Sequence, residues 1–335
     1  MLNKTLLLAV GSLAFAVPAQ AHDAWFLPSV TVLSDTNQGI TVDAATSSVP
    51  FVANHAPLNV DAVQVQAPDG TAGKIENVAR GRYRSTFDVV IDKPGTWRIG
   101  TTMDAVMGRF KVNGEDWMVG RRRGPGGPGG PGAGGPGTGG PAAGGPGMGA
   151  ESGNRPPMPP AGGPAGGPGG PGGPGGEGGG PRRMIDPAHI VASVADIPAG
   201  ATDLDLTQNQ SRNEFFVTAG EPTQTVLQAT GKGLEMVPVT HPDDLVTTEP
   251  GKFRFLVDGK PAAGLKVEFV PNAQRFRDGD HAQALTTGAD GVVTIKWPVA
   301  GFYWVNASLT DDKPTAPRAT KRRLTYTATL EVVAP

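Results

Sequence analysis

The 335-residue sequence contains no cysteine, and this absence excludes two kinds of structure. An exported chain without cysteine has no disulfide framework, and a metal bound to it has no thiolate ligand. Any metal must therefore be held by histidine, carboxylate, methionine or backbone groups. Histidine is itself scarce, because the chain has only five, so each histidine can be weighed individually as a ligand.

The sequence also lacks an excess of basic charge and lacks long apolar runs. The 29 Lys and Arg residues nearly balance the 31 Asp and Glu residues, so no positive field favours nucleic acid or an anionic membrane as a partner. After the first 21 residues, no apolar run approaches the roughly 20 residues of a membrane-spanning helix. We expect no membrane span in the mature chain.

Familiar catalytic motifs are missing as well. The chain has no Gly-x-Ser-x-Gly elbow, no His-Glu-x-x-His pair and no Walker loop. Its long Gly-rich tract lacks the Gly-Lys-Ser/Thr ending of a phosphate-binding loop. We therefore expect a protein that is not an enzyme.

The first 21 residues have the three parts of a secretory signal peptide. Lys4 precedes the apolar run 6–17, and the small-residue pattern Ala19-x-Ala21 follows it. The apolar run is too short for a permanent membrane anchor. The pattern predicts cleavage after Ala21 and a periplasmic protein whose first mature residue is His22.

A histidine at the start of a mature chain is a chelating group. Its α-amine, with an unperturbed pKa of about 8, and its imidazole can bind the same divalent metal. His22 is for this reason the strongest candidate ligand in the sequence. The alternative is that His22 is an arbitrary polar residue at the start of an exported chain.

Two segments have the pattern of β-structure, and neither shows sustained helical periodicity. In residues 22–120, short alternating runs such as 40–44 and 83–89 are separated by turn signals, which predicts an immunoglobulin-like β-sandwich. The same pattern resumes in residues 184–335 and predicts a second sandwich. We expect an all-β protein in which Trp25, Trp97, Trp297 and Trp304 pack in the cores.

Between these segments, residues 121–183 repeat Gly-Pro-Gly-Gly units. Glycine does not occupy every third position, so the segment does not predict a collagen triple helix. Its few apolar residues cannot offset the entropy of ordering the chain, which predicts a disordered insertion. We expect a solvated, tolerated insertion, and the alternative is a functional segment that acts as a spacer or contacts cell-wall polymer.

Five motifs are spread over both β-segments: His22-Asp23-Ala24-Trp25, Asn54-His55-Ala56-Pro57, Pro94-Gly95-Thr96-Trp97, Thr240-His241-Pro242-Asp243 and Gly301-Phe302-Tyr303-Trp304. Together they resemble a family of exported bacterial proteins of unknown function, which is similar to the periplasmic component of nickel/cobalt uptake systems. The resemblance implies a periplasmic, all-β protein involved in transition-metal handling. A further segment, residues 250–310, resembles a carboxypeptidase-regulatory or transthyretin-like domain, which implies a binding module.

The histidines within these motifs give a concrete metal site. His22 would supply its amine and imidazole to Ni(II), Co(II) or Cu(II), and His55, His241 or both would complete a nitrogen-rich set. Asp23 would add an oxygen ligand or orient an imidazole. The alternative for His55 is a loop histidine with local hydrogen bonds, and for His241 it is a turn histidine.

Three functions are consistent with these observations. We expect a non-catalytic periplasmic protein that binds a divalent transition metal and presents it to a membrane transporter or another envelope protein. The second is a structural or interaction sandwich without metal. The third is a copper-dependent oxidoreductase built on the N-terminal histidine.

Overall fold

The computed structural model describes residues 23–120, 185–279 and 281–335. These residues form β-strands together with short 3-10 helices of three residues each, which confirms the predicted all-β fold. Within this described part, no helix is long and apolar enough to cross a membrane. The predicted signal peptide, His22 and the insertion 121–183 lie outside the described residues.

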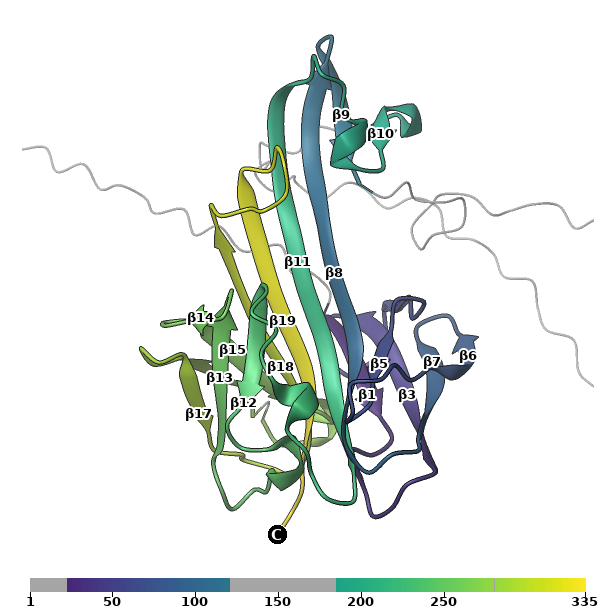
Figure 1. Ribbon diagram of the computed structural model, residues 1–335, viewed down its shortest axis with the longest axis vertical. Helices are drawn as coiled ribbons and strands as arrows, with labels where there is room; N and C mark the ends of the chain where they lie inside the picture. Colours follow the sequence, from purple (N-terminus) through teal and green to yellow (C-terminus); the bar gives the residue numbers. More distant parts are fainter. Residues whose placement is uncertain (1–22, 121–184, 280) are drawn as a thin grey trace, which may run out of the picture. The chain divides into compact units, whose positions relative to one another are not determined.

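The strands form three sheets, which we call sheets A, B and C (Figure 1). Sheet A has the order β1-β3-β7-β6, with β4 paired to β3. Its strands are β1 (Asp23–Pro28), β3 (Gln38–Ser47), β4 (Ala56–Pro57), β6 (Glu76–Arg80) and β7 (Ser85–Ile91). Sheet C consists of β12 (Leu234–Pro238), β13 (Gly251–Val257), β14 (Lys260–Pro261) and β17 (Val292–Ile295).

Sheet B is the largest sheet and has the order β10-β9-β8-β11-β19-β18-β15-β16. Two further short strands, β2 (Val32–Leu33) and β5 (Gln64–Gln66), pair with β11 and β8. The remaining strands are β8 (Gly95–Val112), β9 (Glu115–Val119), β10 (Ile190–Val191), β11 (Thr202–Ala219), β15 (Lys266–Pro271), β16 (Gln283–Thr286), β18 (Gly301–Asp311) and β19 (Lys321–Val332).

The 3-10 helices lie in the connections: η1 (Pro187–His189), η2 (Val194–Asp196), η3 (Thr225–Leu227), η4 (Pro242–Asp244) and η5 (Gln274–Phe276). Of these, η4 bears on the candidate site because His241 directly precedes it. A turn this short buries little surface. It therefore serves to position the side chains next to it.

Strand β11 joins the two halves of the molecule. It pairs antiparallel with β8 on one side and parallel with β19 on the other, and Figure 1 shows the long strands β8 and β11 running side by side. Neighbouring residues of β11 point to opposite faces of sheet B. Phe215 packs in the core beneath sheet A, whereas Phe216 packs in the core beneath sheet C.

The two hydrophobic cores therefore lie on opposite faces of one shared sheet. The core between sheets A and B contains Phe26, Ile40, Val42, Phe87, Val89, Trp97, Ile99, Phe215 and Val217. The core between sheets C and B contains Phe216, Met236, Phe253, Phe255, Phe269, Trp297, Tyr303, Tyr326 and Leu330.

This arrangement changes how the predicted domains relate to each other. The segments 22–120 and 184–335 share a sheet, because β11 of the second segment supplies Phe215 and Val217 to the core beneath sheet A. The described residues 23–120 and those from 187 onward belong to a single compact unit. The four tryptophans expected in the cores are buried, each with at most 4% of its surface exposed: Trp25, Trp97, Trp297 and Trp304.

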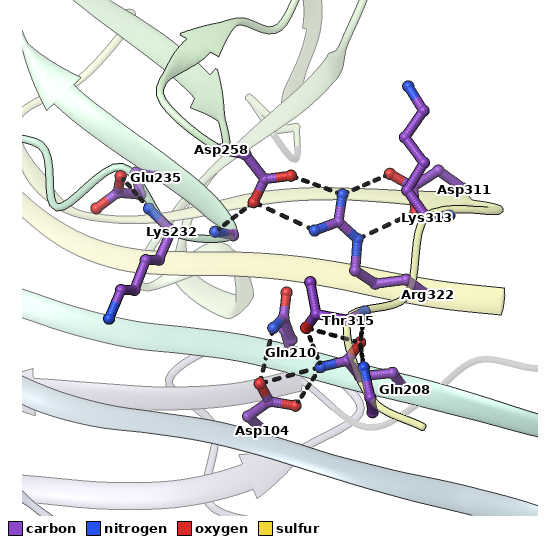
Figure 2. A network of polar contacts seen from close by, with 12 residues as sticks. Asp104, Gln208, Gln210, Lys232, Glu235, Asp258, Asp311, Lys313, Thr315 and Arg322 are labelled. Atoms are coloured by element: carbon purple, nitrogen blue, oxygen red, sulfur yellow. Dashed lines mark hydrogen bonds and ion pairs between the residues drawn. The ribbon is translucent and has the colours of Figure 1, made fainter. Parts of the chain in front are cut away.

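A network of ion pairs closes the sheet C side of the molecule (Figure 2). Arg322, which is only 2% exposed, binds Asp311 at 2.7 Å and Asp258 at 2.8 Å. Hydrogen bonds from the guanidinium hold the pKa of each carboxyl below its usual value. These contacts tie β19 to the ends of β13 and β18.

Candidate functional site

The start of β1 is fixed by two tryptophans. The indole Nε1 of Trp25 donates a hydrogen bond to Ser47 Oγ at 2.7 Å, and both residues are buried. From β18, the indole of Trp304 donates to the carbonyl of Ala24 at 3.1 Å. The described chain therefore begins on a strand that both sheet A and sheet B hold in place.

The loop 48–55 packs against the same tryptophan. Phe51 meets Trp25 edge-on, with 5.7 Å between ring centroids, and has a left-handed backbone with φ 64°. At the base of the loop, the backbone N–H of Ser48 donates to Asn54 Oδ1 at 3.3 Å. These contacts fix the loop that ends at His55.

Strand register brings Asp23 and His55 to the same end of sheet A. Thr46 of β3 pairs with Ala24 on one side and with Ala56 on the other. Ser47, the next residue of β3, pairs with Asp23, and His55 directly precedes Ala56. Because adjacent strands lie about 4.8 Å apart, the backbones of Asp23 and His55 are separated by about 10 Å.

This register bears directly on the predicted ligands. His22 directly precedes Asp23 in the sequence. His22 itself is outside the described residues. His55 is exposed to solvent. The fold thus places His55 within two strand spacings of the residue that follows His22.

His241 does not join this group. It is 6% exposed and caps η4 by accepting a hydrogen bond from the N–H of Asp243 on Nδ1 at 3.1 Å. Its Nε2 lies 3.1 Å from Thr96 Oγ1 and 3.3 Å from the carbonyl oxygen of Thr223. Both ring nitrogens are therefore used in structural contacts.

Strand alternation places His241 on the other side of sheet B. Its partner Thr96 lies on β8 next to Trp97, which points into the core beneath sheet A. Thr96 therefore faces away from sheet A. The structure does not bring His241 to Asp23 and His55.

The remaining described histidines, His189 and His281, lie in other parts of the chain. His189 stacks on Trp117 with 4.5 Å between ring centroids, and its Nε2 lies 3.6 Å from Glu115. His281 lies in the connection between β15 and β16. Among the residues that the structure describes, no group of three or more His, Asp or Glu side chains is arranged to hold a metal ion.

A groove beside the start of β1 was not apparent from the sequence. It has a volume of about 590 Å³, and Asp23, Ala24 and Trp304 form part of its wall. Its floor is the face of sheet B that sheet A leaves uncovered. The available sequence signal was the alternation of Ser, Thr and Asn along 209–213 and 325–329.

A buried charged network lies on the opposite face of β11. Glu214 is 5% exposed, burial raises its pKa, and Tyr326 donates a hydrogen bond to it at 2.8 Å. Arg212 pairs with Glu235 at 3.1 Å and lies 4.0 Å from Glu214. Glu214, Glu235 and Tyr326 are buried and paired, so the network supports the packing of sheet B.

Comparison with known proteins identifies the family. A comparison with curated proteins gives no match. The family model described as "Domain of unknown function (DUF4198)" matches residues 19–311, which include β1 with Asp23, the loop with His55 and η4 with His241. The chain therefore belongs to the DUF4198 family.

Proposed function

We propose that the mature protein is a non-catalytic, periplasmic metal-binding protein that holds a divalent transition metal through His22 and His55. The metal is Ni(II), Co(II) or Cu(II), each of which accepts nitrogen ligands. The observation that supports this proposal is the register of β1, β3 and β4, which brings His55 and Asp23 to the same end of sheet A.

The ligand set would contain three nitrogens. The α-amine and imidazole of His22 form one chelate, and the exposed imidazole of His55 supplies the third nitrogen. Asp23 would contribute a carboxylate oxygen or a hydrogen bond that orients an imidazole. His241 takes no part, because its ring nitrogens hold η4 and Thr96.

The location of the site supports a role in metal transfer. Asp23 and His55 lie at one end of sheet A, and His55 is exposed. A partner can approach an exposed ligand and displace it, whereas a buried structural metal would be enclosed. We propose a membrane metal transporter of the nickel/cobalt type, or another envelope protein, as that partner.

Metal titration of three forms of the protein tests the proposal. Protein matured by signal peptidase is compared with a form that carries one extra N-terminal alanine and with His55→Ala. Titration with Cu(II), Ni(II) and Co(II) should show one tight equivalent for the mature wild-type protein and weaker binding for the extended form and for His55→Ala. His281→Ala is the matched control and should bind like the wild type.

Each alternative outcome has a clear meaning. If the extended form binds as tightly as the mature form, the amine–imidazole chelate is refuted. If no form binds metal, the protein is instead an interaction module without a metal.

The same two histidines also favour a second candidate function, a copper-dependent oxidoreductase. An N-terminal amine and two imidazoles form a redox-competent copper site in copper monooxygenases that attack polysaccharides. Turnover of a polysaccharide with copper, a reductant and oxygen would establish this function. Metal binding without turnover would leave the transfer role.

A further inference from the structure

The groove beside the start of β1 lies on a part of sheet B that no other sheet covers. Sheet A packs over Phe215 and Val217 of β11 and ends before Asn213. Beyond that point the face is hollowed, with a volume of about 590 Å³. Binding sites for small molecules commonly have volumes of about 300–1,000 Å³.

The groove floor is a regular array of neutral polar side chains. Thr101, Asn213, Thr327 and Asn306 lie side by side across β8, β11, β19 and β18. A second row, two residues further along each strand, contains Ser211, Thr325 and Ser308, with Met103 at its end. Seven of these eight side chains carry a hydroxyl or an amide.

Asn213 is the residue of this array whose side-chain amide lacks a hydrogen-bond partner in the described structure. It is only 8% exposed, and both its amide oxygen and its amide nitrogen are buried without a hydrogen-bond partner within the described structure. By contrast, the neighbouring Asn306 donates to Thr327 Oγ1 at 3.2 Å. Buried polar atoms are nearly always paired, so an unpaired amide in a groove floor marks a missing partner.

The charges that line the groove and the backbone pairing of its strands limit the kinds of ligand that it can bind. Two acidic and two basic residues line the groove, so it has no excess of positive charge to select an anion; they are Asp23, Glu268, Arg212 and Arg323. An extended peptide binds by adding a strand to a sheet edge. In this groove the backbone groups of β8, β11, β19 and β18 are already paired to one another, so recognition must come from side-chain hydroxyls and amides.

We propose that this groove binds a neutral saccharide. Sugar hydroxyls donate and accept hydrogen bonds, which matches the amide of Asn213 and the adjacent Thr and Ser hydroxyls. The groove also offers apolar surface from Leu58, Ala62 and Met103 to the C–H groups of a sugar ring. The proposal does not rest on metal binding, because its residues differ from His22 and His55.

Binding of defined sugars to the metal-free mature protein tests this assignment. Glucose, N-acetylglucosamine, cellotetraose and chitotetraose are the neutral probes, with citrate and glucuronate as anionic comparators. Calorimetry and the fluorescence of Trp304, which lines the groove, report binding. At least one neutral sugar should bind saturably, and Asn213→Ala should weaken that sugar by about tenfold or more.

A second pair of variants keeps the test decisive if Asn213→Ala fails to fold. Ser308 is exposed and lines the groove, so Ser308→Trp should block sugar binding. Thr310 is exposed on the same face of β18 and lies outside the groove lining, so Thr310→Trp should leave binding unchanged.

Three results would overturn the proposal. These are the absence of saturable binding by every neutral probe, tighter binding of citrate or glucuronate, and sugar binding that Ser308→Trp leaves intact. His55→Ala should bind sugar like the wild type, so loss of the metal site and loss of the sugar site can be told apart.

Discussion

The two faces of sheet B are built differently. The face beneath sheet C is packed along β18 and β19 by apolar residues from Tyr303 to Ala307 and from Leu324 to Val332. Beyond the apolar core, the Arg322 ion pairs close that side. The face beneath sheet A is packed over parts of β8, β11 and β18, and beyond them it is open and polar.

We expect the closed face of sheet B to determine stability and its open end to determine binding. On the closed face, Arg322 and His241 have their polar groups paired within the protein, whereas Trp297 Nε1 is buried without a partner in the described structure. On the half-covered face, Asp23 from the start of β1 lines the groove, and the groove floor contains the unpaired amide of Asn213. Substitutions on the closed face should therefore change folding, whereas substitutions at the open end should change binding.

The largest expected effect comes from removing the phenylalanines that β11 contributes to each core. Phe215→Ala and Phe216→Ala should each lower the free energy of unfolding by about 3–5 kcal/mol, because each leaves a cavity in a packed core. Since one strand serves both cores, we expect each variant to unfold in one transition. Chemical denaturation followed by tryptophan fluorescence and by circular dichroism measures both quantities.

That experiment also tests whether the two sandwiches form one unit. If Phe215→Ala unfolds in two steps and the second step matches the wild type, the sandwiches are energetically independent. Coincident curves from the two probes would support the shared sheet.

The next effect is the loss of the Arg322 ion pairs. Arg322→Met should lower the free energy of unfolding at neutral pH by about 2 kcal/mol, less than for a fully buried pair because Asp258 is partly exposed. The lowered pKa values of Asp258 and Asp311 mean that this stabilisation is present above their usual pKa of 3.8. It is lost as the pH falls through the lowered pKa values.

Denaturation of the wild type and Arg322→Met from neutral to acidic pH measures this effect. The difference between the two proteins should shrink below about pH 4. A difference that stays constant into acid would show that the ion pairs contribute nothing and that Arg322 acts only through packing.

A smaller effect distinguishes His241 from His55. His241→Ala should lower the free energy of unfolding by about 1 kcal/mol, the usual cost of removing a helix cap. His241→Asn should recover much of that loss, because asparagine also caps helices. His55→Ala, at an exposed position, should leave stability nearly unchanged and should reduce metal affinity.

Thermal melts and metal titrations of these three variants complete the contrast. Loss of metal binding in His241→Asn would restore the ligand set that the sequence predicted and would contradict a purely structural role for His241.

The smallest effect concerns the buried carboxyl of Glu214. Because burial raises its pKa above the usual 4.5, ionisation costs the folded protein more than the unfolded chain as the pH rises above 4.5. Glu214→Gln removes that cost and keeps an oxygen to accept from Tyr326. The variant should be slightly more stable than the wild type at pH 7 and should match it in acid.

Chemical denaturation at several pH values measures the effect of Glu214→Gln. A variant that is less stable at neutral pH would show that the charge of Glu214 is needed by Arg212.

The sequence predicted the strands and buried tryptophans well because these follow from local alternation. It did not predict that one sheet would serve both sandwiches. Phe215 and Phe216 are adjacent apolar residues, and only the pairing of β11 with both β8 and β19 shows that each belongs to a different core. Pairing partners of this kind are far apart in sequence.

The candidate site could be predicted only in part, because strand pairing again joins residues that are far apart in sequence. Motif positions favoured His55 and His241 equally, but the strand register brings only His55 to the start of β1. The groove was missed because alternating Ser, Thr and Asn residues are typical of any solvated strand. The burial of Asn213 depends on where sheet A ends on sheet B, and the local sequence around Asn213 does not predict that position.

Counting the nitrogen ligands of bound copper tests the proposed metal site most directly. Electron paramagnetic resonance of Cu(II) on the mature protein should show three directly bound nitrogens, and on His55→Ala it should show two. If His55→Ala retains all three nitrogens, or if the mature protein binds no copper, the pairing of His22 and His55 is contradicted.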